Sequence, residues 1–105
     1  MNEEILTITE NLADDGICNL YAKGRIDSNS ADLLKDKLDN ALKTEHKTII
    51  LNMSQVKYLS SIGIRVILNT YKQAKEAGKK FNIARPSDFV KNVLGMVALK
   101  EMLVT

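Results

Sequence analysis

The sequence has 105 residues, of which 45% are apolar and 27% charged, and this composition is typical of one globular domain. Its formal net charge is only +2, and it contains three tyrosines, two phenylalanines and no tryptophan. So weak a charge and so few stacking residues argue against direct binding of nucleic acid. The single cysteine, Cys18, excludes an internal disulfide and fits a reducing compartment.

The N-terminal residues have neither the basic segment nor the apolar segment of a signal peptide. No stretch approaches the roughly 18 apolar residues that a membrane-spanning helix needs. We therefore expect a cytoplasmic protein that does not insert into a membrane.

The first residues predict a β-hairpin. Residues 5–12 alternate between apolar and polar side chains, which indicates a half-buried strand. An Asp-Asp-Gly turn at 14–16 follows, and residues 17–23 then predict the returning strand. Gly24 breaks this second pattern.

A helix is expected over about 30–43, and Ser28, Asn29 and Ser30 are all suitable N-caps for it. Its apolar face comprises Leu33, Leu34, Leu38, Ala41 and Leu42. Residues 47–53 then contain a continuous apolar run, which favours a central strand covered on both faces.

The second half of the chain predicts a helix over about 61–77, with Gly78 as its left-handed cap, and a strand over 80–84. Pro86 suits the first position of a further helix that ends near Gly95. The last residues, 98–104, are compatible with a final short helix. The expected fold class is thus α/β, a single domain over residues 1–105 in ββαβαβα order, with a mixed four-stranded sheet and about four helices. The crossovers between parallel strands are expected to be right-handed.

Enzyme chemistry has little support in this sequence. His46 is the only histidine and stands in a polar stretch, whereas metal sites and catalytic triads need several converging partners. Cys18 lies within a predicted strand, which favours a buried structural thiol. No glycine-rich phosphate loop occurs, and turn geometry accounts for Asp27. We therefore expect a protein that is not an enzyme and has no cofactor or metal site.

The most informative segment is the strand–loop–helix unit over 51–68. Ser60 and Ser61 stand where the helix begins, and either can accept a backbone N–H bond as its cap. Helical spacing places one apolar stripe toward the core: Ile64, Ile67, Leu68, Tyr71 and Ala74.

On the opposite side, Ile62 and Val66 either pack under a neighbouring helix or form an exposed patch beside the serines, which would mark a partner surface. Gly63 between them permits the close approach of another backbone.

At these residues the sequence resembles the STAS domains of the anti-sigma factor antagonist family. The resemblance covers nearly the whole chain and is carried by four stretches: Gly24–Asp27, Ile49–Ser54, Val56–Ile64 and Leu94–Leu103. Two positions depart from the family pattern, which has an aspartate where this chain has Asn52 and another where it has Ser60.

The resemblance implies a protein that regulates transcription by partner switching. The unmodified domain binds an anti-sigma factor, a serine kinase of the histidine-kinase-like ATPase fold, and so releases a sigma factor. Phosphorylation frees the kinase, and a serine phosphatase reverses the modification. By its place in the motif Ser61 is the expected acceptor, with Ser60 as a second candidate. The expected partner-binding residues are Asp27, Ser60, Ile62, Gly63, Arg65, Val66 and Asn69.

Two other functions are compatible with the sequence. The domain could be an adaptor subunit of a membrane-associated transport or signalling complex without a phosphorylation cycle. It could also be a small enzyme with Ser61 as its nucleophile, but His46 precedes the central strand in a different loop, so this alternative lacks a base.

Overall fold

The computed structural model describes residues 5–12, 16–96 and 103–104, and within them it contains five strands and three helices. In chain order these are β1 (Thr7–Leu12), β2 (Ile17–Ile26), α1 (Ala31–Leu42), β3 (Thr48–Leu59), α2 (Ser61–Glu76), β4 (Lys80–Ala84), α3 (Asp88–Met96) and β5 (Leu103–Val104). The predicted α/β class and the mixed sheet are confirmed.

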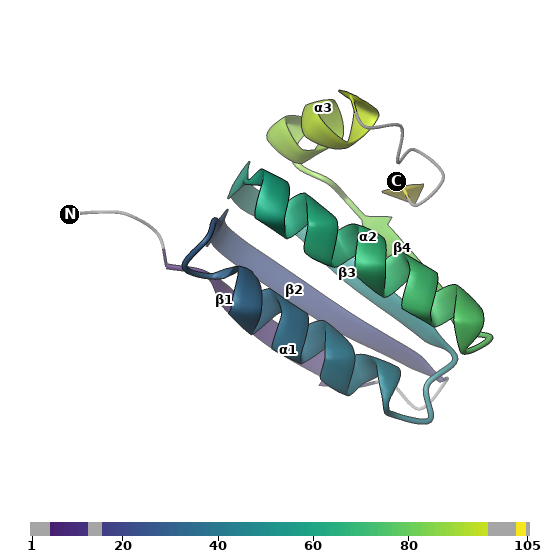
Figure 1. Cartoon of the computed structure of the whole chain (residues 1–105). Coiled ribbons are helices and arrows are strands. Elements are labelled where there is room, and N and C mark those ends of the chain that lie inside the picture. Colours follow the sequence, from purple (N-terminus) through teal and green to yellow (C-terminus); the bar gives the residue numbers. More distant parts are fainter. Residues whose placement is uncertain (1–4, 13–15, 97–102, 105) are drawn as a thin grey trace.

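The five strands form one sheet in the order β1-β2-β3-β4-β5. β1 and β2 are antiparallel, as the hairpin predicted, and every later strand is parallel to its neighbour. Each crossover therefore adds a strand on the same side of the previous one. Because right-handed crossovers that advance in one direction place their helices on one face, α1 and α2 lie side by side across the same face of the sheet (Figure 1).

The core lies between this sheet face and the helices. In β3 the residues Ile49, Leu51 and Met53 are fully buried, whereas Ile50 between them is only half-buried. The prediction that this apolar run is covered on both faces was therefore wrong: α1 and α2 lie across one face, and Ile50 on the other face is only partly buried. The apolar run 49–51 reflects a half-exposed isoleucine on that face, which composition alone does not separate from a buried one.

The ends of three elements differ from the prediction. β2 continues through Gly24 to Ile26, and β3 continues to Leu59. Pro86 precedes α3 rather than opening it. Ser87 caps this helix instead, because its Oγ accepts a hydrogen bond from the backbone N–H of Val90 (3.2 Å) and donates one to the carbonyl of Val56 (2.7 Å).

The prediction of a final helix over 98–104 is wrong for residues 103–104, the only ones in this range that the structure describes. Leu103–Val104 form the short strand β5, which pairs in parallel with the end of β4. Residues 97–102 lie outside the described part of the chain. At the other end of α2, Gly78 has a φ of +73°, as predicted for a left-handed helix cap.

Candidate functional site

The start of α2 is attached to the end of β2. The backbone N–H of Ser60 donates a hydrogen bond to the carbonyl of Ile26 at 2.8 Å. Gly63 is buried in the first turn of the helix, where an added Cβ would lie 2.6 Å from Cγ2 of Ile26 and 2.8 Å from Cδ1 of Leu59. The glycine thus admits two side chains, and not another backbone as expected, and it holds the helix start against the sheet.

The two serines at this helix start have different environments. Ser60 has extended backbone angles and is the N-cap, because its Oγ accepts a hydrogen bond from the N–H of Gly63 at 3.2 Å. Ser61 is the first residue of the helix and is exposed. Its hydroxyl makes no hydrogen bond to any described residue. The cap is therefore assigned to Ser60, and the Ser61 hydroxyl faces solvent.

An exposed stripe continues from Ser61 along α2. Arg65 and Asn69 follow at intervals of four residues, and both are exposed. Ile62 lies beside this stripe with 45% of its surface exposed. Val66 differs, because it is half-buried and packs against the core. The sequence allowed either packing or exposure for both of these apolar residues, and the structure shows that Ile62 is exposed while Val66 is packed.

The core side of α2 differs in part from the predicted stripe. Its buried residues are Gly63, Ile67, Thr70 and Ala74, while Ile64, Leu68 and Tyr71 are half-buried and pack against the core. Thr70 was missed because threonine is polar. It is tolerated there because its hydroxyl donates to the carbonyl of Val66 at 2.9 Å.

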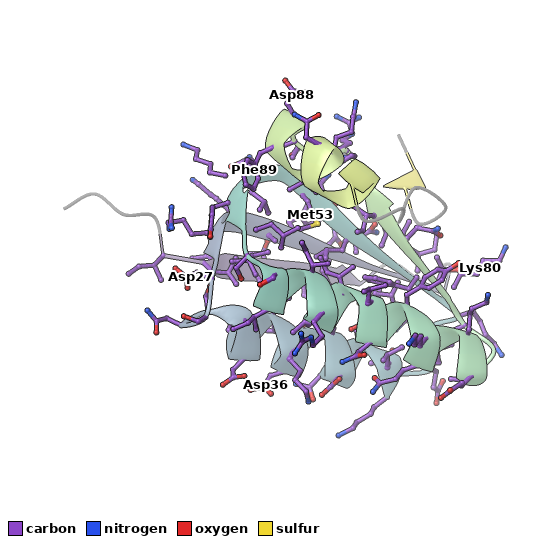
Figure 2. All side chains as sticks on the ribbon, turned by 45° about the horizontal axis from the view of Figure 1, so that its top comes forward. Asp27, Asp36, Met53, Lys80, Asp88 and Phe89 are labelled. Atoms are coloured by element: carbon purple, nitrogen blue, oxygen red, sulfur yellow. The ribbon has the colours of Figure 1, made fainter. Side chains whose placement is uncertain are left out.

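Asp27 lies in the turn that joins β2 to α1, beside the start of α2, and Figure 2 shows it at the opposite end of the sheet from Lys80. Its Oδ1 accepts backbone N–H bonds from Asn29 (3.0 Å) and Ser30 (3.2 Å). The Ser30 hydroxyl donates to the carbonyl of Arg25 (2.8 Å) and accepts from the N–H of Asp27 (2.9 Å). Ser30 thus occupies the predicted N-cap position of α1, but its side chain bonds backward into the turn.

The pKa of Asp27 follows from this turn. Desolvation acts to raise the pKa of the carboxyl group, but the hydrogen bonds from Asn29 and Ser30 and the positive charge of Arg25 outweigh it. The pKa of Asp27 is therefore held below its ordinary value. The carboxylate therefore stays ionised, and it stabilises the turn by accepting hydrogen bonds from the backbone N–H groups of Asn29 and Ser30.

Sequence reasoning missed a stacked group near the same end of the sheet. The guanidinium carbon of Arg25 lies 4.4 Å from the centre of the Tyr58 ring, and the ring centres of Tyr58 and Phe89 are 5.8 Å apart. The Nε of Arg25 lies 3.7 Å from Oδ2 of Asp27. Arg25 contacts Tyr58 because the two residues are paired on the neighbouring strands β2 and β3. Tyr58 contacts Phe89 because α3 lies close to the end of β3. Neither was visible from spacing along the chain.

The residues considered for enzyme chemistry lie far from the serines or are buried. His46 is in the loop before β3, with its Nδ1 3.0 Å from the Thr44 hydroxyl. Ser61 follows the other end of that 12-residue strand, about 35 Å away at about 3.3 Å per residue. His46 is therefore out of reach as a base for Ser61.

Cys18 is fully buried, as predicted. Burial raises the pKa of its thiol, and the charge of Glu10 adds to this, so the reactive thiolate is disfavoured. Among the described residues, no three histidine, cysteine or acidic side chains gather as metal ligands would. None of the helices in the described ranges is long and apolar enough to cross a membrane.

Known structures share this fold. The SpoIIAA anti-sigma factor antagonist in its unphosphorylated form superposes with a TM-score of 0.81 at 16% identity, over 93% of this chain and 86% of that one. The phosphorylated form of the Bacillus cell fate determinant SpoIIAA gives 0.75 at 15% identity, over 93% and 89%. An anti-sigma factor antagonist from Mycobacterium paratuberculosis gives 0.78 at 19% identity, over 92% and 83%.

The sequence itself matches the family model for the STAS domain over residues 9–105. This match covers most of the hairpin, the central strand, the helix start with its two serines and the C-terminal region. Together with the shared fold, it confirms the resemblance drawn from the motif around Ser60–Ile64. The chain belongs to the STAS domain family.

Proposed function

We propose that this protein is a cytoplasmic anti-sigma factor antagonist controlled by phosphorylation of Ser61. In its unmodified form it binds an anti-sigma factor that is also a serine kinase of the histidine-kinase-like ATPase fold. Phosphorylation releases that partner, and a serine phosphatase restores the binding form. The fold shared with proteins named as anti-sigma factor antagonists supports the general role.

The main support for the proposal is that the two serines differ in their structural roles. Ser60 provides the helix cap, so the hydroxyl of Ser61 is not needed for the fold. Ser61 is exposed at the first position of α2, where a kinase can reach it. A hydroxyl that is accessible and structurally dispensable suits a reversible modification better than one that closes a helix turn.

The fold can accommodate a phosphate on Ser61. A phosphoserine carries about −1.5 to −2 charges at neutral pH, and a helix N-terminus favours a negative charge by roughly 0.3–1 kcal/mol. In the first turn of α2, the N–H of Gly63 is taken by the Ser60 cap, whereas those of Ser61 and Ile62 have no acceptor among the described residues. Arg65, one turn along, adds a positive charge. The modified domain is therefore expected to stay folded.

A partner that covers this helix start would respond in the opposite way. Burying a doubly charged group without a matching cation costs several kcal/mol. A loss of about 3–4 kcal/mol weakens binding by roughly a hundredfold to a thousandfold. The phosphate is thus tolerated by the domain and excluded from the interface, which is the behaviour that partner switching requires.

We place the partner surface on the exposed side of α2 and the adjoining turn. Ile62 supplies its exposed apolar contact, and Arg65 and Asn69 extend it along the helix. Ser60 and Asp27 lie at its border. Gly63 and Val66 contribute indirectly, because one is buried and the other packs against the core, so they set the position of the helix start.

The test is phosphopeptide mapping after incubation with the cognate kinase and ATP. Wild-type protein should carry one phosphate, on Ser61; Ser61→Ala should carry none, and Ser60→Ala should still be modified at Ser61. A phosphate found on Ser60 alone would overturn the assignment. If neither serine is modified and the protein co-purifies with a membrane transport complex, the domain is instead an adaptor without a phosphorylation cycle.

A further inference from the structure

The sheet face opposite the helices carries a hollow that the proposed function does not use. Its floor is a row of neighbouring residues on three strands: Thr9 of β1 pairs with Tyr21 of β2, which pairs with Asn52 of β3. The hollow has a volume of about 550 Å³, within the usual range for small-molecule sites. It lies on the far side of the sheet from α2 and is therefore distinct from the partner surface.

A β-bulge shapes this hollow. Between the pairs Tyr21–Asn52 and Lys23–Gln55, β2 contributes one residue and β3 contributes two, so β3 bends at this point. The Asn52 side chain stabilises the bulge, because its Oδ1 accepts hydrogen bonds from the N–H (3.0 Å) and the hydroxyl (2.9 Å) of Ser54. Its NH₂ group then remains as a donor, without a partner among the described residues. Bulges of this kind often re-aim side chains beside functional sites.

The residues that line the hollow carry only positive or neutral groups. Lys23 contributes from β2, and Arg85 lies where β4 ends; among the described residues of the lining there is no aspartate or glutamate. Arg85 has a φ of +50° and is the only non-glycine residue with positive φ in the described part of the chain. Backbone strain of this kind concentrates at functional sites. The hydroxyls of Thr7, Thr9 and Tyr21 add further donors.

We propose that this hollow binds the phosphate group of a phosphomonoester. Two cations match the charge of a phosphate dianion, and hydroxyl and amide donors can serve its remaining oxygens. Asn52 is important because a carboxylate at the same place would put a negative charge on the floor of the site. The phosphate belongs either to a small polar metabolite or to a phosphatidic acid headgroup, which offer the same chemistry.

The first experiment is an NMR titration of the full chain, with backbone amide shifts followed at low ionic strength. The probes are inorganic phosphate and glycerol 3-phosphate, with glycerol as the neutral control. We expect saturable shifts at the strand residues around Thr9, Tyr21 and Asn52 with both phosphates and none with glycerol. Shifts that do not saturate, or that spread over the lysines of the helices, would overturn the site.

Three variants separate a specific site from general attraction to a basic protein. Arg85→Gln should weaken phosphate binding about tenfold or more, since charge-assisted hydrogen bonds dominate such sites. Asn52→Asp should weaken it similarly, because its carboxylate can still accept the Ser54 hydrogen bonds while adding a negative charge. Lys72→Gln removes one positive charge from the exposed side of α2 and should have no effect. Equal weakening by all three would contradict the proposal.

A second arm identifies the source of the phosphate. Vesicles containing phosphatidic acid are compared with vesicles of phosphatidylcholine alone in co-sedimentation. Binding only to the former, lost in Arg85→Gln and Asn52→Asp, assigns the site to a lipid headgroup, whereas soluble phosphates alone assign it to a metabolite. Both results support the phosphate site, and a lack of binding in both arms refutes it. Because Ser61 is not involved, none of these outcomes bears on partner switching.

Discussion

The starts of α1 and α2 lie at the same end of the sheet, where β2 and β3 end, yet the serines at the two helix starts form different hydrogen bonds. At α1 the Ser30 hydroxyl and the Asp27 carboxylate are both bonded within the turn. At α2 the Ser60 hydroxyl forms the cap, and the Ser61 hydroxyl has no hydrogen bond within the described structure. The comparison teaches that the Ser61 hydroxyl has no structural role because Ser60 already caps α2, whereas the Ser30 hydroxyl holds the turn before α1 together.

The largest expected effect concerns the free serine. Ser61→Asp should weaken binding of the anti-sigma partner by about a hundredfold to a thousandfold, equivalent to about 3–4 kcal/mol, because it places a charge in the interface. Ser61→Ala should bind as wild type. Titration calorimetry measures the affinities, and thermal melting should show both variants folded. Equal affinity for all three proteins would remove Ser61 from the interface.

The next largest effect is on stability, and it should differ between the packed side and the exposed side of α2. Val66→Glu should lower the free energy of unfolding by about 2 kcal/mol or more, because it forces a charge against the core. Ile62→Glu should change it by about 0.5 kcal/mol or less, as is usual at the surface, while it still disrupts the complex. Urea denaturation gives the stabilities. If Ile62→Glu unfolds the protein as readily as Val66→Glu, Ile62 belongs to the core.

The contact between α2 and β2 can be tested at Gly63. Gly63→Ala should cost about 1–3 kcal/mol, because the new methyl group overlaps Ile26 and Leu59, and this outweighs the better helix propensity of alanine. Gly78→Ala is a useful control, since its Cβ would meet nothing within 4 Å and only the positive φ is strained. A stabilised Gly63→Ala protein, measured by denaturant unfolding, would show that the helix start shifts easily.

The two helix starts can be compared by matched substitutions. Ser60→Ala removes one cap and should cost about 1 kcal/mol of stability. Ser30→Ala leaves the N–H of Asp27 and the carbonyl of Arg25 without their partner and should cost more, about 2 kcal/mol. Urea denaturation of both variants measures the difference. The reverse order would mean that the turn before α1 re-forms its bonds with water.

The smallest effect is the pH dependence due to Asp27. Its pKa is lowered in the folded state, so the carboxylate stabilises the fold above its unfolded pKa of about 3.9, and this contribution is lost as the pH falls through the folded value. Asp27→Asn should therefore be slightly less stable than wild type at pH 6, with the difference vanishing in acid. Asp36→Asn, on the exposed side of α1, serves as the control. Parallel curves for wild type and Asp27→Asn would contradict the assigned shift.

Much of the fold was predictable because hydrophobic periodicity is local. The hairpin, the helices over 31–42 and 61–76 and the strand over 80–84 follow from residues within one or two turns of each other. Which faces of β3 are covered by helices could not be predicted in this way, because it depends on the side of the sheet to which each later strand is added. The same limit applies to the stacking of Arg25, Tyr58 and Phe89, which come from three different elements.

By itself the sequence determined the α/β class, the family motif and the place of Ser60 and Ser61 at a helix start, since these depend on side-chain type and spacing. Only the tertiary structure decided which serine caps the helix, that Ile62 is exposed while Val66 is packed, and that Gly63 admits Ile26. It also decided that, within the described residues, the sheet face away from α1 and α2 carries a hollow lined by Asn52 and Arg85. The physical reason is that capping, burial and charge grouping depend on contacts between residues distant in the chain, which local patterns do not encode.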